Sequence, residues 1–480
     1  MNNSDVKKPL KWYDAITMNI VYFGITLRSQ TLTPLIVPLL VQQFVGESTK
    51  GSAYGTIRLA TLMVALLVQA AAGALSDRST SRFGKRRPFI ALSGILEIIA
   101  FIAVGIIAGT MEGMTGYYTL FAVLIFSMVS SNIGHGAAQG IIPDLVPSEK
   151  RGRYSAIKAF FELPLPLIVV AFTVSRMVSN GNIWGAIITI SVVMFVTTVL
   201  TMFVREEPQP GPAKPIDWQA LGRLLIMTLT FTAIILLAGW GVRQLLPILL
   251  SLPNLQSSIL IAIVGVACML LAVAVGVIMS VRISLGEQAS QRPSFTWWVI
   301  NRLAFLVGAN NLSSFVLYLI QERFPQFAGE KAAGPTSQLM LIVGIAILLI
   351  SLPGGWLTDK FGKKPLLLFS GIMASLGTLL VILASSMPLM YVGGVLIGLA
   401  TGIFFSANWA LGTELVPEDQ SGKWLGISNL AGAGAGAVGA YIGGPIGDGA
   451  GYVLLMGLYG FLFLFSTLAL IKIQPSPVEA

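Results

Sequence analysis

Apolar runs of about 20 residues recur from end to end of this 480-residue chain, and they limit its fold more than any other feature. Each run is long enough to cross a bilayer core of roughly 30 Å as an α-helix. Only 11% of the residues are charged, against about 25% in an ordinary soluble domain, so too little charge remains to cover a soluble globule of this size. The sequence therefore predicts an all-α polytopic membrane protein.

Proline, glycine and charged residues divide the apolar runs into fourteen predicted spans. They are 14–42, 52–76, 88–110, 116–143, 154–178, 182–204, 220–250, 257–283, 296–322, 335–358, 365–387, 388–412, 423–447 and 450–472. The first run is too long for a signal-peptide core, so we interpret it as a retained first helix.

The basic residues indicate the orientation of these spans. If the N-terminus is cytoplasmic, most of the 30 Lys and Arg residues face the cytoplasm, and only Lys50, Arg323 and Lys331 lie on the opposite side. The positive-inside rule therefore predicts a plasma-membrane (cell inner membrane) protein with both termini in the cytoplasm. Because topology explains the net charge of +9, we expect no nucleic-acid partner. A single cysteine and a single histidine also argue against a disulfide framework, a metal centre or another cofactor.

Two pairs of cytoplasmic segments match each other across the halves of the chain. Segment 73–88 (GALSDRSTSRFGKRRP) corresponds to 355–365 (GWLTDKFGKKP), and 144–154 (DLVPSEKRGRY) corresponds to 414–424 (ELVPEDQSGKW). Their common order predicts two six-helix bundles related by an internal repeat. The spans 220–250 and 257–283 belong to neither copy and form an inserted hairpin. The predicted domains are 1–205 (N-terminal bundle), 206–292 (linkers and hairpin) and 293–480 (C-terminal bundle).

These repeated segments also resemble a known family. The pattern Gly-x-x-x-Asp-Arg/Lys followed by Gly-Arg/Lys-Lys/Arg resembles the signature of the major facilitator superfamily, and it covers both bundles. The string from Val68 to Ile90, with Leu32-Thr33-Pro34, resembles the branch of sucrose transporters and glycoside–cation symporters. The resemblance implies a secondary active transporter that works by alternating access, in which a cation, a proton or sodium, drives symport of a sugar or glycoside. We expect it to act on a small-molecule solute in the lipid bilayer as a monomer, and not as an enzyme.

The repeated segments supply a predicted cytoplasmic gate. A carboxylate at a helix end can bind the free N–H groups of a neighbouring helix N-terminus. In the superfamily such residues hold the two bundles together on the inside, and the resemblance implies the same role here. The alternative is that the basic residues only set the topology. The predicted gate residues are Gly73, Asp77, Arg78, Gly84, Lys85, Arg86, Arg87, Asp359, Lys360, Gly362 and Lys363.

Polar and aromatic side chains share one helical face in several spans and are candidate solute ligands. Sugars are bound by hydrogen-bonding groups together with rings that cover their apolar face. The same residue types also make hydrogen bonds between helices, which is the alternative. The candidates are Asn19, Phe23, Thr26 and Gln30; Asn132, His135 and Gln139; Asn311, Ser314 and Tyr318; and Asn408 and Trp409.

Ionisable residues inside spans are costly to bury, so they are candidates for coupling. Glu162 forms an i,i+4 pair with Lys158 and is our first choice for proton coupling, followed by Glu97 and His135. Plant sucrose carriers that this chain resembles have a coupling aspartate in the fourth helix, where Met128 stands here. Coupling has therefore either moved, as to Glu162, or does not use that mechanism.

The remaining charges inside spans are basic. Arg28 lies opposite the polar stripe of the first span and is expected to pair with another helix or with an anionic ligand. Arg58, Arg243 and Arg302 are ambiguous between the same two roles. Because bases outnumber acids inside the spans, anionic substrates such as sugar acids remain open.

Two other functional classes compete with the symporter. A proton-coupled exporter of drugs or other amphipathic or anionic solutes is favoured by the inserted hairpin. It is disfavoured by the fifth helix, which reads FELPLP over 161–166 where drug antiporters of the superfamily have a Gly-Pro-rich stretch. A membrane enzyme or receptor is the remote alternative, since the sequence has no nucleophile motif, phosphate loop or soluble domain.

Overall fold

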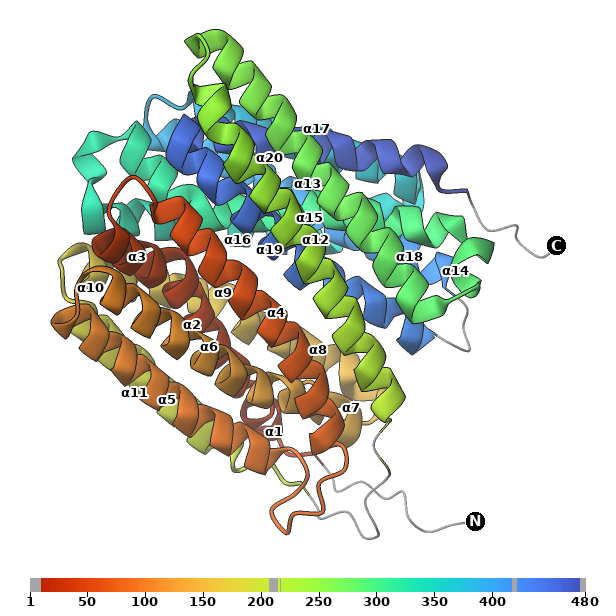
Figure 1. Ribbon diagram of the computed structural model, residues 1–480. Coiled ribbons are helices and arrows are strands. Elements are labelled where there is room, and N and C mark those ends of the chain that lie inside the picture. The colour runs from red at the N-terminus through yellow and green to blue at the C-terminus, as the bar shows by residue number, and fades with distance from the viewer. Residues whose placement is uncertain (1–9, 207–214, 216, 417–420, 475–480) are drawn as a thin grey trace. The chain divides into compact units, whose positions relative to one another are not determined.

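The computed structural model in Figure 1 describes residues 10–206, 215, 217–416 and 421–474. Over these residues the chain consists of helices and short connections, without a strand. Contacts divide the chain into two compact units. The first unit contains Met1–Thr33 and Leu67–Leu221, and the second contains Pro34–Leu66 and Gly222–Ala480. The all-α fold class expected from the apolar runs is therefore confirmed.

The first unit is built from antiparallel helices that approach closely through small residues. A side chain at Gly94 would collide with Thr198, and one at Gly136 would collide with the backbone of Gln69, so glycine lets these helices touch. The helices α5 and α11 lie side by side, and so do α5 and α6 (Figure 1). The helices of this unit are α1 (Asp14–Thr17), α2 (Ile20–Thr31), the end of α4 (Lys50–Ser76), α5 (Arg87–Thr110), α6 (Gly113–Ala138), α7 (Ile141–Leu145), α8 (Ser148–Glu162), α9 (Pro164–Val169), α10 (Ser175–Ser179) and α11 (Ile183–Thr201).

Two predicted spans are interrupted at proline. The first continues beyond α2 through a π-helical turn, Leu32–Ile36, which contains Pro34. The fifth is broken between α8 and α9 at Pro164 and contains a second π-helical turn, Val170–Val174. Proline has no N–H to donate and its ring clashes with the preceding turn, so it removes a helical hydrogen bond and favours a break or an irregular turn at these two positions.

The second unit contains the longest helices. Its most buried helix is α15, in which 83% of the most apolar stretch is buried. On α15, the Phe305 ring stacks on Phe404 of α18 with centroids 3.7 Å apart. The helices are α3 (Val37–Val45), the start of α4, α12 (Trp218–Leu250), α13 (Asn254–Leu285), α14 (Gln288–Gln291), α15 (Pro293–Arg323), α16 (Ala333–Phe361), α17 (Lys363–Leu383), α18 (Met387–Leu415), α19 (Ser421–Ala450) and α20 (Tyr452–Leu468), with 3₁₀ turns at Pro325–Phe327, Gly329–Ala332 and Ala469–Lys472.

The inserted hairpin, α12 and α13, packs on other helices of the second unit. The Ser284 hydroxyl lies 3.3 Å from the Met227 sulfur across the hairpin. The fully buried Phe231 ring fills the space left by Gly276 of α13 and by Gly434 of α19. This hairpin thus belongs to the same compact unit as the C-terminal helices. The three predicted domains, with boundaries at 205 and 292, remain a prediction.

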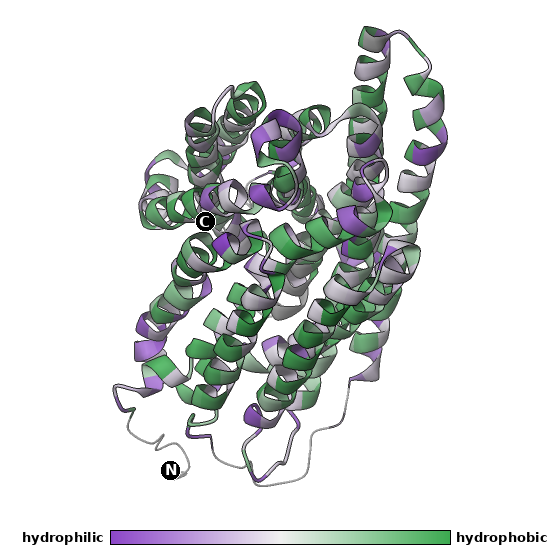
Figure 2. Cartoon of the chain, turned by 90° about the vertical axis from the view of Figure 1, so that its left-hand side faces the viewer, coloured by the Kyte–Doolittle hydropathy of each residue, from purple (hydrophilic) through white to green (hydrophobic). Residues whose placement is uncertain are grey.

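Thirteen helical segments of the described chain are long and apolar enough to cross a membrane. The remaining predicted span, 423–447, lies in α19, where the side chains of several residues are outside the described part of the chain. Hydrophobic residues dominate the helix surfaces in Figure 2, and hydrophilic residues gather at helix ends and connections. Such a surface, with Leu352 88% exposed, identifies a multi-pass membrane protein.

Candidate functional site

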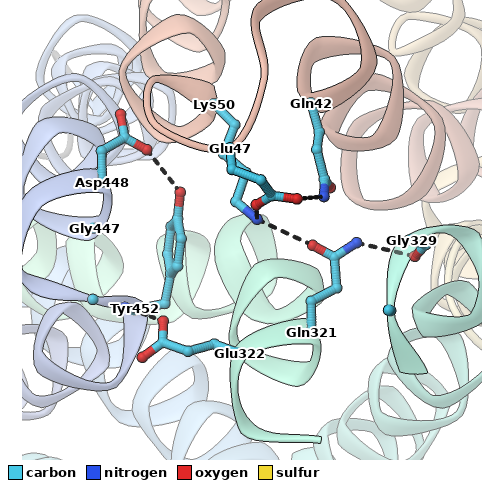
Figure 3. A pocket seen from close by; sticks show the side chains of 11 residues that line it. Gln42, Glu47, Lys50, Gln321, Glu322, Gly329, Gly447, Asp448 and Tyr452 are labelled. Atoms are coloured by element: carbon cyan, nitrogen blue, oxygen red, sulfur yellow. Dashed lines mark hydrogen bonds and ion pairs between the residues drawn. The ribbon is translucent and has the colours of Figure 1, made fainter. Parts of the chain in front are cut away.

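A polar pocket of about 340 Å³ lies in the second unit, where the ends of α3, α4, α15, α19 and α20 meet (Figure 3). We call six of its polar and charged residues the Lys50–Asp448 cluster. The cluster consists of Glu47, Lys50, Gln321, Glu322, Asp448 and Tyr452. Sequence reasoning missed it, because its members come from segments far apart in the chain. The one available signal was Lys50, one of only three bases predicted on that side.

Asp448 caps the first turn of α4. Its carboxylate accepts hydrogen bonds of 2.7 Å from the backbone N–H groups of both Gly51 and Ser52, and one of 3.0 Å from the Tyr452 hydroxyl. The first N–H groups of a helix have no partner within the helix and carry the positive end of its dipole. A carboxylate from α19 therefore binds the N-terminus of α4 through charge-assisted bonds.

Lys50 ties the same helix start to α15 and α20. Its ammonium is 2.6 Å from a Glu47 carboxylate oxygen and 3.3 Å from the Gln321 amide oxygen, and it lies 4.6 Å from the centroid of the Tyr318 ring. Although burial alone would raise it, hydrogen bonds from Lys50 and Gln42 hold the pKa of Glu47 below its usual value. The pocket therefore contains one ion pair, Glu47 with Lys50, and two carboxylates, Asp448 and Glu322, that accept hydrogen bonds from backbone N–H groups.

The predicted ligands on α15 are buried between helices. The Tyr318 hydroxyl donates to the Pro38 carbonyl oxygen at 2.8 Å, and the Asn311 amide donates to the Ala435 carbonyl oxygen of α19 at 3.0 Å. The Ser314 hydroxyl donates to the Asn310 carbonyl oxygen at 2.9 Å within its own helix. In this conformation the tyrosine and the asparagine make interhelical hydrogen bonds, and the solute-binding role of all three stays a prediction.

The predicted ligands of the first span differ in exposure. Asn19 is fully buried and donates to the Ala15 carbonyl oxygen at 2.9 Å. Phe23, Thr26 and Gln30 follow on α2 and are half-buried.

A line of side chains joins α6 to α2 and α8. The His135 ring packs edge-on against Tyr22 with centroids 6.4 Å apart, and the Lys158 ammonium lies 4.3 Å from the centroid of that Tyr22 ring. The Lys158 ammonium is also 3.8 Å from the Glu162 carboxylate, the ion pair expected from their spacing. Two candidates for coupling, His135 and Glu162, are thus connected through Tyr22, which sequence reasoning did not single out.

The other predicted residues of α6 have different surroundings. Asn132 is buried and donates to the Met128 carbonyl oxygen at 2.8 Å. Gln139 is exposed, with its amide nitrogen 3.5 Å from the His135 ring nitrogen Nε2.

Glu97 forms a buried network with Arg28. The Arg28 Nε lies 2.7 Å from a Glu97 carboxylate oxygen, and Arg28 Nη2 donates to the Ser127 hydroxyl at 2.5 Å. The Ser127 hydroxyl in turn lies 3.3 Å from the same carboxylate. Both charged side chains are almost completely buried, on α2 and α5. The helix partner expected for Arg28 is therefore an acid already singled out as a coupling candidate.

The first cytoplasmic segment forms an ion-pair cluster within the first unit. Arg86 binds both Asp77 and Asp144, and Lys85 lies 2.9 Å from Asp144. Glu206 accepts hydrogen bonds from the backbone N–H groups of Arg86 at 2.9 Å and Arg87 at 3.1 Å, so this glutamate caps α5. Sequence reasoning expected Asp77 to bind a helix N-terminus, whereas here its partner is the Arg86 side chain.

Three further predicted residues shape this segment. Gly84 has a φ of 95°, a backbone conformation that favours glycine. Arg78 donates to the Ala74 carbonyl oxygen at 3.0 Å, and Gly73 packs near the Gly136 carbonyl oxygen.

The second cytoplasmic segment repeats part of this arrangement. Lys363 pairs with Glu414, which are the counterparts of Lys85 and Asp144 under the repeat. Gly362, the counterpart of Gly84, also has a positive φ, 86°. Asp359 is exposed, and the Lys360 ammonium lies 4.9 Å from the Trp356 ring centroid. Pro417 of the second Leu-Val-Pro motif lies outside the described residues.

Asn408 and Trp409 lie beside an arginine on α15. Arg302 Nη1 donates to the Asn408 side-chain oxygen at 2.9 Å, and the Arg302 guanidinium carbon is 5.7 Å from the Trp409 ring centroid. Asn408 is fully buried, whereas Trp409 is 47% exposed.

The sequence of this chain is similar to those of known proteins. The sequence matches the model of the Major Facilitator Superfamily over residues 18–322 and 303–480. The minor myo-inositol transporter IolF of Bacillus subtilis (strain 168) is 34% identical over 88 residues, which are 18% of this chain and 20% of that protein. The sucrose transport protein SUT2 of Oryza sativa subsp. japonica is 25% identical over 266 residues, 46% of this chain and 51% of that protein.

The curated relatives are matched over only part of their length, from about a fifth in the inositol transporter to about half in the sucrose transport protein. Among solved structures, a D-xylose-proton symporter superposes with a TM-score of 0.64 at 15% identity, covering 97% of this chain and 98% of that one. At this identity the likeness establishes the fold.

Proposed function

Because the chain belongs to the Major Facilitator Superfamily, we propose that it is a secondary active transporter that carries a sugar or glycoside together with a cation, by alternating access. The observation that carries the proposal is the Lys50–Asp448 cluster. It closes the junction of α4 with α15, α19 and α20 through a few polar contacts. Such contacts hold one state and can be exchanged for contacts with water in another. The similarity to inositol, sucrose and xylose transporters supports a sugar as the solute.

The proposed solute ligands remain those on the polar faces of α2, α6, α15 and α18. They offer amide, hydroxyl and aromatic groups, the mixture that sugars require. Half-buried Phe23, Thr26 and Gln30 and exposed Trp409 are accessible in this conformation, whereas Asn311 and Tyr318 become available only when their interhelical bonds open.

We propose Glu162 as the coupling carboxylate, with His135 and Glu97 as the other candidates. The Glu162 side chain is 40% exposed and its Lys158 partner is at 3.8 Å, so a proton or cation from water can reach it without breaking a tight pair. Glu97 is completely buried and already neutralised by Arg28. For a proton or cation to reach Glu97, the surrounding helices therefore have to rearrange more than at Glu162.

The cytoplasmic segments form the proposed inner gate. The matching pairs Lys85–Asp144 and Lys363–Glu414 support equivalent roles for the two copies. In the proposed orientation these segments face the cytoplasm and the Lys50–Asp448 cluster faces outward across the plasma membrane. The distribution of the basic residues supports that orientation.

Export of anionic or amphipathic solutes in exchange for protons is the second candidate. Arg58 and Arg243 favour it, because both lie inside predicted spans and no described carboxylate forms an ion pair with either. Arg243 contacts only the Thr56 hydroxyl at 3.4 Å and the Tyr441 ring among the described residues.

Uptake into proteoliposomes tests the proposal and separates the two candidates. A panel of radiolabelled neutral sugars, glycosides and sugar acids is offered with an imposed proton or sodium gradient, and without one. We expect at least one sugar to accumulate only when a cation gradient is present. Uptake of no sugar, together with proton-driven expulsion of dyes, would replace symport by export.

A further inference from the structure

Arg302 lies in the interior of the second unit and has no acidic partner among the described residues. It lies about 14 Å along α15 from Pro293, at 1.5 Å per residue, and therefore within the predicted hydrocarbon core. Its Nη1 bonds to Asn408 and its buried Nε has no hydrogen-bond partner in the described part of the chain. No carboxylate among the described residues forms an ion pair with it.

The first unit shows how this protein neutralises a buried arginine when no ligand is needed. Arg28 has the Glu97 carboxylate at 2.7 Å and the Ser127 hydroxyl as a further acceptor. A guanidinium in a bilayer is costly unless a counter-ion compensates it. Within the described part of the chain Arg302 lacks such a counter-ion, and an anion from outside the chain could supply it.

Neighbouring side chains fix the orientation of the Arg302 guanidinium. The Asn408 amide, which orients the guanidinium, donates to the Asn301 side-chain oxygen at 3.0 Å. The Asn408 carbonyl oxygen accepts from the Trp298 indole at 2.9 Å. Both ends of Asn408 are therefore fixed to α15, and the acceptor that positions Arg302 cannot turn away. The next residue, Trp409, offers a half-exposed indole face beside the guanidinium.

We propose that Arg302 binds a carboxylate of the transported solute, so that the solute is an acidic sugar or an acidic glycoside. A planar guanidinium matches a carboxylate through two parallel hydrogen bonds, and lysine cannot reproduce that geometry. The Trp409 ring supplies the apolar surface on which the face of a sugar ring packs. This inference rests on the proposed function and narrows its substrate class.

A matched pair of solutes tests the inference. Methyl β-D-glucuronide and methyl β-D-glucoside differ only at carbon 6, which is a carboxylate in the first and an alcohol in the second. In proteoliposomes of the unaltered protein we expect uptake of the glucuronide to exceed that of the glucoside at least tenfold. Arg302→Gln should remove this preference, and Arg302→Lys should recover only a minor part of it. Arg282→Gln, which alters an exposed arginine of α13 in the same unit, should leave the preference unchanged.

A binding measurement keeps the inference testable if a variant transports nothing. The glucuronide should raise the melting temperature of the purified protein, and it should fail to do so for Arg302→Gln. Uptake of the glucoside without uptake of the glucuronide would overturn the inference and leave sugar symport standing. Uptake of neither solute, with stabilisation by the glucuronide that depends on Arg302, would overturn the proposed transport alone. Uptake of neither without stabilisation would overturn both.

Discussion

At the scale of single residues, charged side chains within the predicted spans have three kinds of surroundings. Arg28 and Glu97 neutralise each other in full burial, Lys158 and Glu162 form a looser pair near water, and Arg302 has no acidic partner among the residues that the structure describes. A buried ion pair adds little stability over an apolar replacement, but removal of one partner leaves the other charge uncompensated. These three situations predict different responses to mutation.

Glu97→Gln should destabilise the protein strongly, because it leaves the Arg28 guanidinium buried without a counter-ion. The expected loss is about 3–5 kcal/mol, the magnitude observed when one partner of a buried pair is removed. Thermal unfolding in detergent measures it, and the double variant Arg28→Gln with Glu97→Gln should recover most of the loss. Glu162→Gln is the matched control and should shift the melting temperature little. A Glu97→Gln variant as stable as the unaltered protein would show that the pair is not structurally required.

Glu162→Gln should instead affect coupling. Because an amide cannot carry the charge that pairs with Lys158, we expect loss of gradient-driven accumulation while solute exchange across the membrane continues. Exchange and accumulation are measured on the same proteoliposomes, so altered expression does not mimic the effect. If accumulation stays at the level of the unaltered protein, Glu162 has no part in coupling.

At the scale of helices, the internal repeat is visible in the ion pairs as well as in the sequence. Lys85 with Asp144 and Lys363 with Glu414 occupy equivalent positions, and in each pair the lysine directly follows a glycine with positive φ. Proline, glycine and charged residues predicted the approximate ends of the helices. The repeat predicted which segments of the two halves are equivalent. The breaks at Pro34 and Pro164 also lie at visible sequence signals, although the π-helical turns beside Pro34 and over Val170–Val174 do not.

The contacts between helices could not be predicted in the same way. Asp448 caps α4 although it lies 397 residues after Gly51 and 396 residues after Ser52 in the chain. Helical periodicity gives the face on which a residue lies but not the neighbour that this face meets. For the same reason Arg28 could be assigned a partner helix in general, while its specific partner, Glu97, required the structure.

Asp448→Asn should loosen the junction between α4 and α19. The variant loses the charge that strengthens two hydrogen bonds to the helix start, and a hydrogen bond to a charged group contributes about 1.5–3 kcal/mol. The reporter is a cysteine introduced at buried Ser314, in a background in which Cys268 is replaced by alanine. In the Asp448→Asn variant this cysteine should react with a water-soluble maleimide roughly tenfold faster, because 1.4 kcal/mol corresponds to a factor of ten.

Glu287→Gln, which changes an exposed carboxylate outside the Lys50–Asp448 cluster, serves as the control and should leave the reaction rate unchanged. Equal rates in Asp448→Asn and in the unaltered protein would mean that the cluster does not hold this junction closed.

At the scale of the whole molecule, the fold class and the superfamily followed from apolar runs and a repeated motif, and both are confirmed. Substrate and coupling ion do not follow from fold, because one superfamily fold serves many solutes. We propose that they depend on a few side chains, among them Glu162, Arg302 and Trp409.

Cation movement driven by the solute tests the central proposal most directly. Proteoliposomes without any imposed ion gradient receive the transported sugar from outside, while a trapped pH dye and a trapped sodium dye report the lumen. Symport predicts that one of the two cations enters together with the solute, in a fixed ratio to it. Exit of protons as the solute enters, or solute entry without movement of either cation, would contradict cation-coupled symport.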